Sequence, residues 1–216
     1  CDISLNELTG IYATLANNGR WVKQHIIVQV LDDKKRVIYQ YHGEARDVFT
    51  PVIARQVTGM LQNVLDFGTG APVRSEYGFN APAAGKTGTT NDYKDAWFEG
   101  FTTHLVAGVW IGYDKPREVM PGGYAAKVAL PVWASAMKQE HGDPKQGLYV
   151  MEDFPVPAGL EEVNLGGGLF GGGGERYYLT PEQRSILDLE PTSASPGNDN
   201  APRGRSVIDR IFDIFR

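Results

Sequence analysis

One short string, Gly-Lys-Thr-Gly-Thr-Thr at residues 85–90, constrains the fold of this chain more than any other feature. Loops that hold nucleotide phosphates contain a similar lysine, but their motif needs a glycine at position 80 and a helix that starts at the lysine. The chain has Asn80 at that position, and Gly88 follows Lys86 and Thr87 where a helix would have to continue. The string therefore predicts a strand and argues against a phosphate loop.

Such a strand would present two different sets of side chains. Alternate side chains face opposite ways, so Lys86, Gly88 and Thr90 share one face while Thr87 and Thr89 share the other. Gly88 lets an extended substrate lie against the backbone. Lys86 brings positive charge towards a nucleophile and an anionic substrate, and a threonine after the glycine offers a hydroxyl for a carboxylate and an amide for an oxyanion. For the triplet alone, the competing interpretation is an edge strand with a solvated lysine.

Capping signals predict the helices around this strand. Ser4 and Glu7 form a capping box, so a helix is expected over 4–19. Thr50 followed by Pro51 predicts a second helix that ends near residue 68. A closing helix is expected over 126–138, interrupted or started by Pro131. The apolar faces of the first two helices are expected to contain Leu5, Leu8, Ile11, Tyr12 and Leu15, and then Ile53, Val57, Met60, Leu61 and Val64.

Runs rich in β-branched and aromatic residues predict the strands. Residues 21–31 and 36–41 flank a polar tetrapeptide and are expected to form a hairpin. Further strands are expected over 84–90, 96–102 and 105–113. This mixture predicts an α+β fold, with one antiparallel sheet made of the hairpin and the three later strands and flanked by helices.

The composition changes after about residue 150. A run of glycines at 166–174 has no strand before it and no helix after it, which favours a flexible linker over a ligand-binding loop. Residues 151–205 are therefore expected to be a Gly/Pro-rich flexible extension of a domain over 1–150. Residues 206–216 predict a short amphipathic helix, which would pack on a partner or a membrane surface, or else weakly on its own domain.

Charge and composition exclude several classes of function. Lys and Arg total 21 against 26 for Asp and Glu, and no basic patch argues for nucleic acid. Cys1 is the single cysteine and the four histidines lie far apart, so no disulfide, metal site or cofactor is expected. No apolar run approaches the ~20 residues that a membrane span needs. Because the chain starts with Cys1 instead of Met and enters a helix at once, we expect a fragment of a longer protein.

Six ordered blocks of the sequence, one of which contains the Lys-Thr-Gly triplet, resemble one known family. The blocks are residues 4–8 with 12–19, then 57–64, 68–71, 84–91, 95–98 and 109–114. From residue 3 to about 140, the chain resembles the transpeptidase domain of the penicillin-binding proteins, in particular the bifunctional class A enzymes of the 1B type. The resemblance assigns residues 1–150 to the C-terminal part of such a domain and implies its fold, which serine β-lactamases share.

This resemblance implies a peptidoglycan D,D-transpeptidase, which cross-links the cell wall by serine acyl transfer. In the family, a serine attacks the D-Ala-D-Ala end of a stem peptide, the last D-Ala leaves, and the acyl group passes to an amine on another strand. β-Lactam antibiotics acylate the same serine. By resemblance, Lys86 belongs to the catalytic polar network around the nucleophile. Thr87, Gly88, Thr89 and Thr90 would bind the substrate, and Thr89 would also supply a catalytic oxyanion-hole amide.

The family's other two motifs, Ser-x-x-Lys and Ser-x-Asn, do not occur at their expected places. Ser135 and Lys138 spell the first motif, but they follow the Lys-Thr-Gly triplet, whereas the family order puts them before it. Ser4 and Asn6 spell the second, but they belong to a helix start. The nucleophile is therefore expected upstream of Cys1, and this chain alone is expected to be inactive.

A class A parent would have a glycosyltransferase domain and a membrane anchor ahead of this chain, at the periplasmic face of the bacterial inner membrane. Its partners would be peptidoglycan stem peptides, β-lactam antibiotics and other cell-wall synthesis proteins. Two alternatives stay open: a truncated, non-catalytic binding module, and a serine β-lactamase or β-lactam sensor. The blocks at 13–19 and 95–98 favour the synthase.

Overall fold

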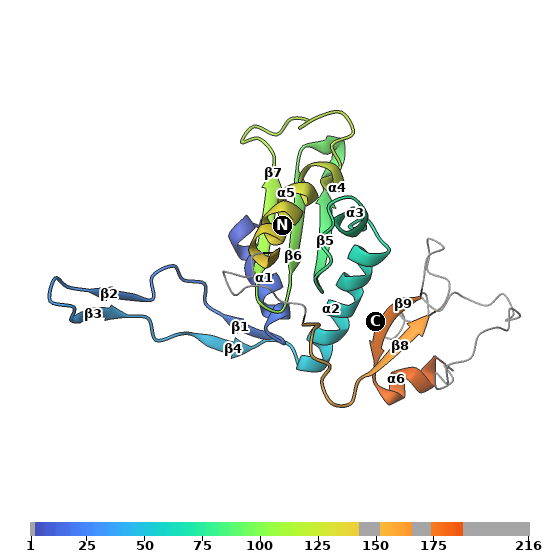
Figure 1. The fold of residues 1–216 in the computed structure, drawn as a ribbon, viewed down its shortest axis with the longest axis horizontal. Coiled ribbons are helices and arrows are strands. Elements are labelled where there is room, and N and C mark those ends of the chain that lie inside the picture. Colours follow the sequence, from blue (N-terminus) through green and yellow to red (C-terminus); the bar gives the residue numbers. More distant parts are fainter. Residues whose placement is uncertain (1–2, 143–151, 166–173, 188–216) are drawn as a thin grey trace, which may run out of the picture.

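The computed structural model describes residues 3–142, 152–165 and 174–187. Its centre is a three-stranded antiparallel sheet formed by β5 (Ala84–Thr89), β6 (Ala96–Phe101) and β7 (Val106–Ile111). The strand order is β5-β6-β7, so β5 is an edge strand of this sheet (Figure 1). The three predicted strands and the mixed α+β class are confirmed.

Helices cover both faces of the sheet and flank β5 (Figure 1). They are α1 (Leu5–Ala16), α2 (Pro51–Asp66), α3 (Pro72–Ser75), α4 (Ala125–Val128) and α5 (Leu130–Gly142), and the short 3-10 helix η1 (Asn91–Tyr93) follows β5. α1 covers the face that carries Glu99, which Thr9 of α1 contacts. α5 covers the opposite face, where the rings of Trp133 and Phe98 are 4.9 Å apart. α2 packs beside β5.

The core lies between the sheet and α5. Phe98, Trp133, Leu130 and Met137 are fully buried, and Trp133 Nε1 donates to the carbonyl oxygen of Ala107 (3.0 Å). The predicted closing helix is therefore confirmed as a core element, although it is divided into α4 and α5.

Side-chain caps confirm the predicted helix starts. Ser4 Oγ accepts from the backbone N–H of Glu7 (3.2 Å), while the Glu7 carboxylate accepts from the backbone N–H of Ser4 (2.9 Å). Thr50 Oγ1 accepts from the backbone N–H of Ile53 (3.3 Å) at the start of α2. The predicted apolar faces are wrong in part, because Ile11 and Ile53 are exposed.

The structure departs from the predicted flexible extension over 151–205. In its described parts, β8 (Glu161–Leu165) pairs with β9 (Glu175–Leu179), and α6 (Pro181–Ile186) follows. β9 packs along α2 and covers a face whose buried side chains are mostly polar. The physical reason is that side chains of α2 form hydrogen bonds with the backbone of β9, which is distant in the sequence. The predicted amphipathic helix at 206–216 lies outside the described residues.

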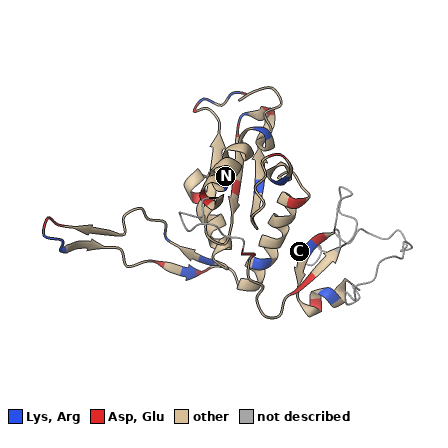
Figure 2. Cartoon of the chain, in the orientation of Figure 1, with Lys and Arg blue, Asp and Glu red and all other residues tan. Residues whose placement is uncertain are grey.

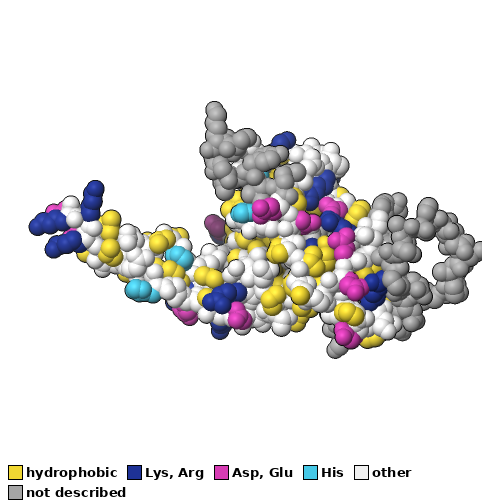
Figure 3. All heavy atoms as spheres, turned by 60° about the horizontal axis from the view of Figure 1, so that its bottom comes forward, with side chains coloured by type: hydrophobic (Ala, Val, Ile, Leu, Met, Phe, Trp, Pro, Cys, Tyr) yellow, Lys and Arg dark blue, Asp and Glu magenta, His cyan; other side chains and the backbone are white. Residues whose placement is uncertain are grey.

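The predicted hairpin over 21–41 does not join the central sheet. It forms a separate ribbon that projects from the body (Figure 1). Its strands are β1 (Arg20–Val22), β2 (Gln29–Leu31), β3 (Val37–Gln40) and β4 (Ala45–Asp47), and β1 pairs with β4 while β2 pairs with β3. Apolar side chains are exposed along the ribbon, which extends to the left in Figure 3.

Gly19 explains why the ribbon leaves the body. Its φ of +88° turns the chain after α1 in a conformation that only glycine adopts without strain. Its carbonyl oxygen accepts from the backbone N–H groups of Val48 (2.9 Å) and Phe49 (3.1 Å). Hydrogen bonds to Gly19 therefore hold together the two ends of the ribbon, where the chain leaves the body and where it returns.

Charged side chains of both signs are interspersed over the described elements (Figure 2). In the same part of the chain, no helix has the length and apolarity of a membrane span. No group of three acidic, cysteine or histidine side chains is arranged there as a metal site would require.

Candidate active site

β5 places Lys86 at the exposed edge of the sheet. The Lys86 side chain is exposed, and its Nζ donates to the backbone carbonyl oxygen of Thr87 (2.8 Å). Within the described ranges, exposed lysine and arginine side chains such as Arg20 and Lys23 form ion pairs with carboxylates. No carboxylate in those ranges forms an ion pair with Lys86. The ammonium group therefore remains available to an anionic ligand.

The register confirms the predicted division of the strand into two faces. Lys86 pairs with Glu99 of β6, and Thr87 pairs with Phe98, so these two neighbours point to opposite sides of the sheet. Gly88 is opposite Trp97, and a Cβ atom on Gly88 would lie 3.3 Å from Trp97 Cβ, which is tight. The close approach of Trp97 is a second reason for glycine at this position, besides access for a ligand.

The hydroxyl of Thr87 contacts a residue that sequence reasoning had not assigned to the site. Thr69 Oγ1, in the turn after α2, lies 2.6 Å from Thr87 Oγ1. Either hydroxyl can donate in this pair. The Gly-Thr-Gly string at 68–70 was the available signal, because it belongs to one of the blocks of the resemblance, but it was interpreted only as a turn.

The other two threonines of the string have structural partners. Thr89 Oγ1 accepts from the backbone N–H of Ala125 (3.0 Å), the first residue of α4. Thr90 Oγ1 accepts from the backbone N–H of Asp95 (2.8 Å) and donates to its carboxylate (3.2 Å). Asp95 in turn accepts from Trp110 Nε1 (2.9 Å). Thr90 therefore stabilises the β5–β6 turn, and Thr89 links β5 to α4.

Glu99 is a buried carboxyl on the Lys86 face that sequence reasoning missed. It is 2% exposed, and Thr9 Oγ1 lies 3.2 and 3.3 Å from its two carboxyl oxygens. Burial raises the pKa of Glu99 to about 7, and the hydrogen bond from Thr9 lowers it in part. Gly108 leaves the space for this carboxyl, since a Cβ there would lie 2.3 Å from Glu99 Oε1. A lone acidic residue in an otherwise apolar strand was the signal.

Of the two serine motifs, one lies at the start of α1 and the other lies in α5. Ser4 is the N-cap of α1, and its hydroxyl donates to the Glu7 carboxylate (2.7 Å). Ser135 is exposed on α5, and Lys138 Nζ donates to the carbonyl oxygen of Tyr77 (3.3 Å). The described residues thus bring together a free cation and several hydroxyls at β5, without a serine–lysine pair beside them.

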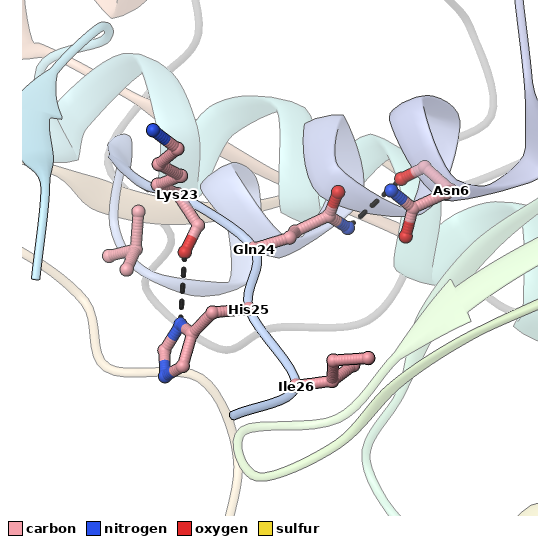
Figure 4. Close-up of a pocket in the computed structure, with 6 residues that line it drawn as sticks. Asn6, Lys23, Gln24, His25 and Ile26 are labelled. Atoms are coloured by element: carbon pink, nitrogen blue, oxygen red, sulfur yellow. Dashed lines mark hydrogen bonds between the residues drawn. The ribbon is translucent and has the colours of Figure 1, made fainter. Parts of the chain in front are cut away.

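A pocket of about 530 Å³ is lined by Asn6 of α1 and by residues 22–26 of the ribbon (Figure 4). Gln24 Nε2 donates to the carbonyl oxygen of Asn6 (2.9 Å) across it, and His25 Nδ1 lies 3.1 Å from the carbonyl oxygen of Lys23. None of its lining residues belongs to the string at 85–90.

Sequence comparison matches residues 1–138 to the penicillin binding protein transpeptidase domain. The chain is 34% identical to penicillin-binding protein 1A of Aquifex aeolicus over 159 residues, which cover 74% of this chain and 21% of that protein. It is 37% identical to penicillin-binding protein 1A of Neisseria meningitidis over 205 residues, which cover 92% of this chain and 23% of that protein. The chain thus spans about a fifth of the length of these relatives.

Structural comparison gives the same picture of the fold. The crystal structure of penicillin-binding protein 1A from Haemophilus influenzae matches with a TM-score of 0.70 at 22% sequence identity. The match covers 83% of this chain and 32% of that structure. At this identity the likeness concerns the arrangement of helices and strands.

Proposed function

The chain belongs to the penicillin-binding protein transpeptidase family, and from that premise we propose that it is the C-terminal part of a peptidoglycan D,D-transpeptidase. The relatives named penicillin-binding protein 1A support a class A parent. The 1B type expected from the sequence stays a prediction. One observation carries the proposal: the edge strand β5 of this fold presents Lys86 with no carboxylate ion-paired to it in the described chain, and the next residue, Thr87, has its hydroxyl in contact with that of Thr69.

In the proposed reaction, a serine outside this chain attacks the carbonyl carbon of the penultimate D-Ala of a stem peptide. The C–N bond to the terminal D-Ala breaks, that D-Ala leaves as a free amine, and an ester to the serine remains. An amine of a second stem peptide then attacks the ester and restores the serine hydroxyl. Penicillin acylates the same serine when its ring amide opens.

The residues of β5 have distinct parts in this proposal. Lys86 contributes a fixed positive charge to the network around the nucleophile and to the substrate carboxylate. The hydroxyl groups of Thr87 and Thr89 donate hydrogen bonds to that carboxylate. Thr89 is well suited to this, because its oxygen accepts from the Ala125 N–H and its own proton is left to donate. The Thr89 amide helps to stabilise the oxyanion, Gly88 leaves room for the peptide, and Thr90 keeps the adjoining turn in place.

The rest of the parent is also part of the proposal. A glycosyltransferase domain and a membrane anchor precede this chain in the parent, which acts at the periplasmic face of the inner membrane. Stem peptides, β-lactam antibiotics and other cell-wall synthesis proteins are its partners, and no cofactor is needed.

A non-catalytic binding module is the second candidate, because no serine–lysine pair lies beside β5 within the described ranges. Fluorescent penicillin distinguishes the two. We expect it to label the full-length protein covalently and to leave the 216-residue chain unlabelled. Ser135→Ala in the full-length protein is the matched control and should not change labelling. Absence of label on both forms supports the binding module, whereas label on the short chain means that its own residues contain the nucleophile.

A further inference from the structure

We propose that Thr69 is a positioning residue for the transpeptidase site: its hydroxyl donates to Thr87 and so directs the Thr87 proton towards the substrate carboxylate. This inference rests on the proposed function. It starts from the 2.6 Å contact between the two hydroxyl oxygens, which joins the end of α2 to the strand that carries Lys86.

Thr69 is held in place by the turn that ends α2. The N–H of Gly70 donates to the carbonyl oxygen of Val64 (3.0 Å), and the N–H of Ala71 donates to that of Gly68 (3.0 Å). A Cβ on Gly70 would lie 2.6 Å from a methyl carbon of Leu65 and 3.1 Å from the carbonyl oxygen of Val64, so the turn packs tightly against α2. The backbone on both sides of Thr69 is therefore fixed against the helix.

α2 itself is anchored on its other side. Asn63 Nδ2 donates to the carbonyl oxygen of Arg176 (2.8 Å), and the N–H of Arg176 donates to Asn63 Oδ1 (3.1 Å). Gln56 Nε2 donates to the carbonyl oxygen of Tyr178 (2.9 Å). Thr69 thus projects from a helix that is fixed between β5 and β9, which suits a residue that must orient a neighbouring group.

The direction of the hydrogen bond between the two hydroxyls decides what Thr87 can bind. If Thr87 donated to Thr69, no proton would remain on Thr87 for a carboxylate oxygen. When Thr69 donates, the Thr87 proton is free to donate to an anion, and the bond it receives strengthens that donation. An anionic substrate is therefore matched only by the arrangement in which Thr69 is the donor.

The first test uses the 216-residue chain and needs no catalysis. Three-bond NMR couplings to the Thr87 methyl group report its side-chain rotamer. We expect one rotamer in the wild type and in Thr69→Ser, which keeps the hydroxyl, and an average over rotamers in the isosteric Thr69→Val. Circular dichroism checks that each variant is folded. A single unchanged Thr87 rotamer in Thr69→Val would overturn the inference, whatever the proposed function turns out to be.

The second test measures acylation of the full-length protein by fluorescent penicillin. Thr69→Val should raise the apparent dissociation constant about fivefold to tenfold, the cost of one hydrogen bond, with little change in the acylation rate at saturation. Thr69→Ser should stay within about twofold of wild type. Because Thr69 acts through Thr87, Thr69→Val should add nothing to Thr87→Val. Full additivity, or an unchanged Thr69→Val, contradicts the inference. An unlabelled wild type contradicts the proposed function instead, and the NMR test then decides the role of Thr69.

Discussion

Lys86 and Glu99 are opposite each other in the β5–β6 register, but they lie in different surroundings. The Lys86 side chain reaches solvent, whereas Glu99 is enclosed by α1 and β7. Lys86 can therefore be changed at little cost to the fold, because the hydrated ammonium contributes little to packing. Glu99, in contrast, affects the stability of the fold, because its ionised form is buried away from the water that would solvate it.

Replacing Lys86 should impair function without destabilising the chain. Lys86→Ala is expected to lower acylation of the full-length protein by penicillin by about 10²-fold or more, because a preorganised charge at the site is lost. Thermal unfolding of the 216-residue variant should match that of the wild type within about 0.5 kcal/mol. Lys34→Ala, at the exposed tip of the ribbon, is the matched control and should retain full acylation. Retained acylation in Lys86→Ala would contradict the assigned role.

Glu99 predicts a pH dependence of stability. Its folded-state pKa of about 7 lies above the ordinary value of 4.5, so the folded chain binds this proton more tightly than the unfolded chain. The contribution is fully present below the ordinary pKa and is lost as the pH rises through 7. Glu99→Gln, which stays neutral, should therefore be more stable than wild type at pH 8 by about 1–3 kcal/mol, with a smaller difference at pH 5.

Urea unfolding at the two pH values measures this difference. Glu76→Gln removes an exposed carboxylate and should leave the wild-type pH dependence intact. If Glu99→Gln loses as much stability as wild type between pH 5 and pH 8, the buried carboxyl is not responsible for the change.

At the scale of elements, the sequence predicted what depends on neighbours along the chain. The caps at Ser4 and Thr50 and the strand that carries Lys86 follow from adjacent residues, and all were predicted. The polar face of α2 was not predicted, because Asn63 has its partner at Arg176, more than a hundred positions away. The Thr69–Thr87 contact was missed for the same reason, since a turn and a strand meet only after α2 has packed against β5.

The Asn63 side chain should therefore determine how firmly β9 is held. Asn63→Ala leaves the N–H and carbonyl groups of Arg176 without their partner and is expected to cost about 1–3 kcal/mol. Hydrogen exchange of the Arg176 amide should accelerate in this variant. Asn164→Ala is the matched control, because Asn164 pairs with Arg176 in the β8–β9 register but is exposed. Equal exchange in the two variants would show that Asn63 does not anchor the strand.

At the scale of the whole molecule, the chain consists of a packed body and a ribbon that protrudes from it (Figure 1). The ribbon has two strands and little core of its own, which makes an isolated ribbon only marginally stable. Ile26 is 97% exposed and Ile38 is 66% exposed. Exposed apolar side chains that are gathered on one segment favour association.

We therefore expect the 216-residue chain to self-associate through the ribbon as its concentration rises. Combining Ile26→Lys with Ile38→Lys should shift sedimentation velocity profiles towards the monomer and leave the melting temperature of the body unchanged. Val132→Lys, which changes an exposed residue on α5, should have no such effect. Equal association in the wild type and the ribbon variant would place the contact elsewhere.

The anchoring of α2 by β9 also bears on how shortened versions of this protein would behave. The match to the transpeptidase-domain family covers residues 1–138, but the guanidinium carbon of Arg55 lies 3.5 Å from the ring centre of Tyr178, well beyond residue 138. A truncation after residue 138 would expose the side chain of Arg55 and its polar neighbours to water. It would also remove β9, the strand that packs against α2. Recombinant versions intended for crystallography or inhibitor screening should therefore extend at least to residue 187.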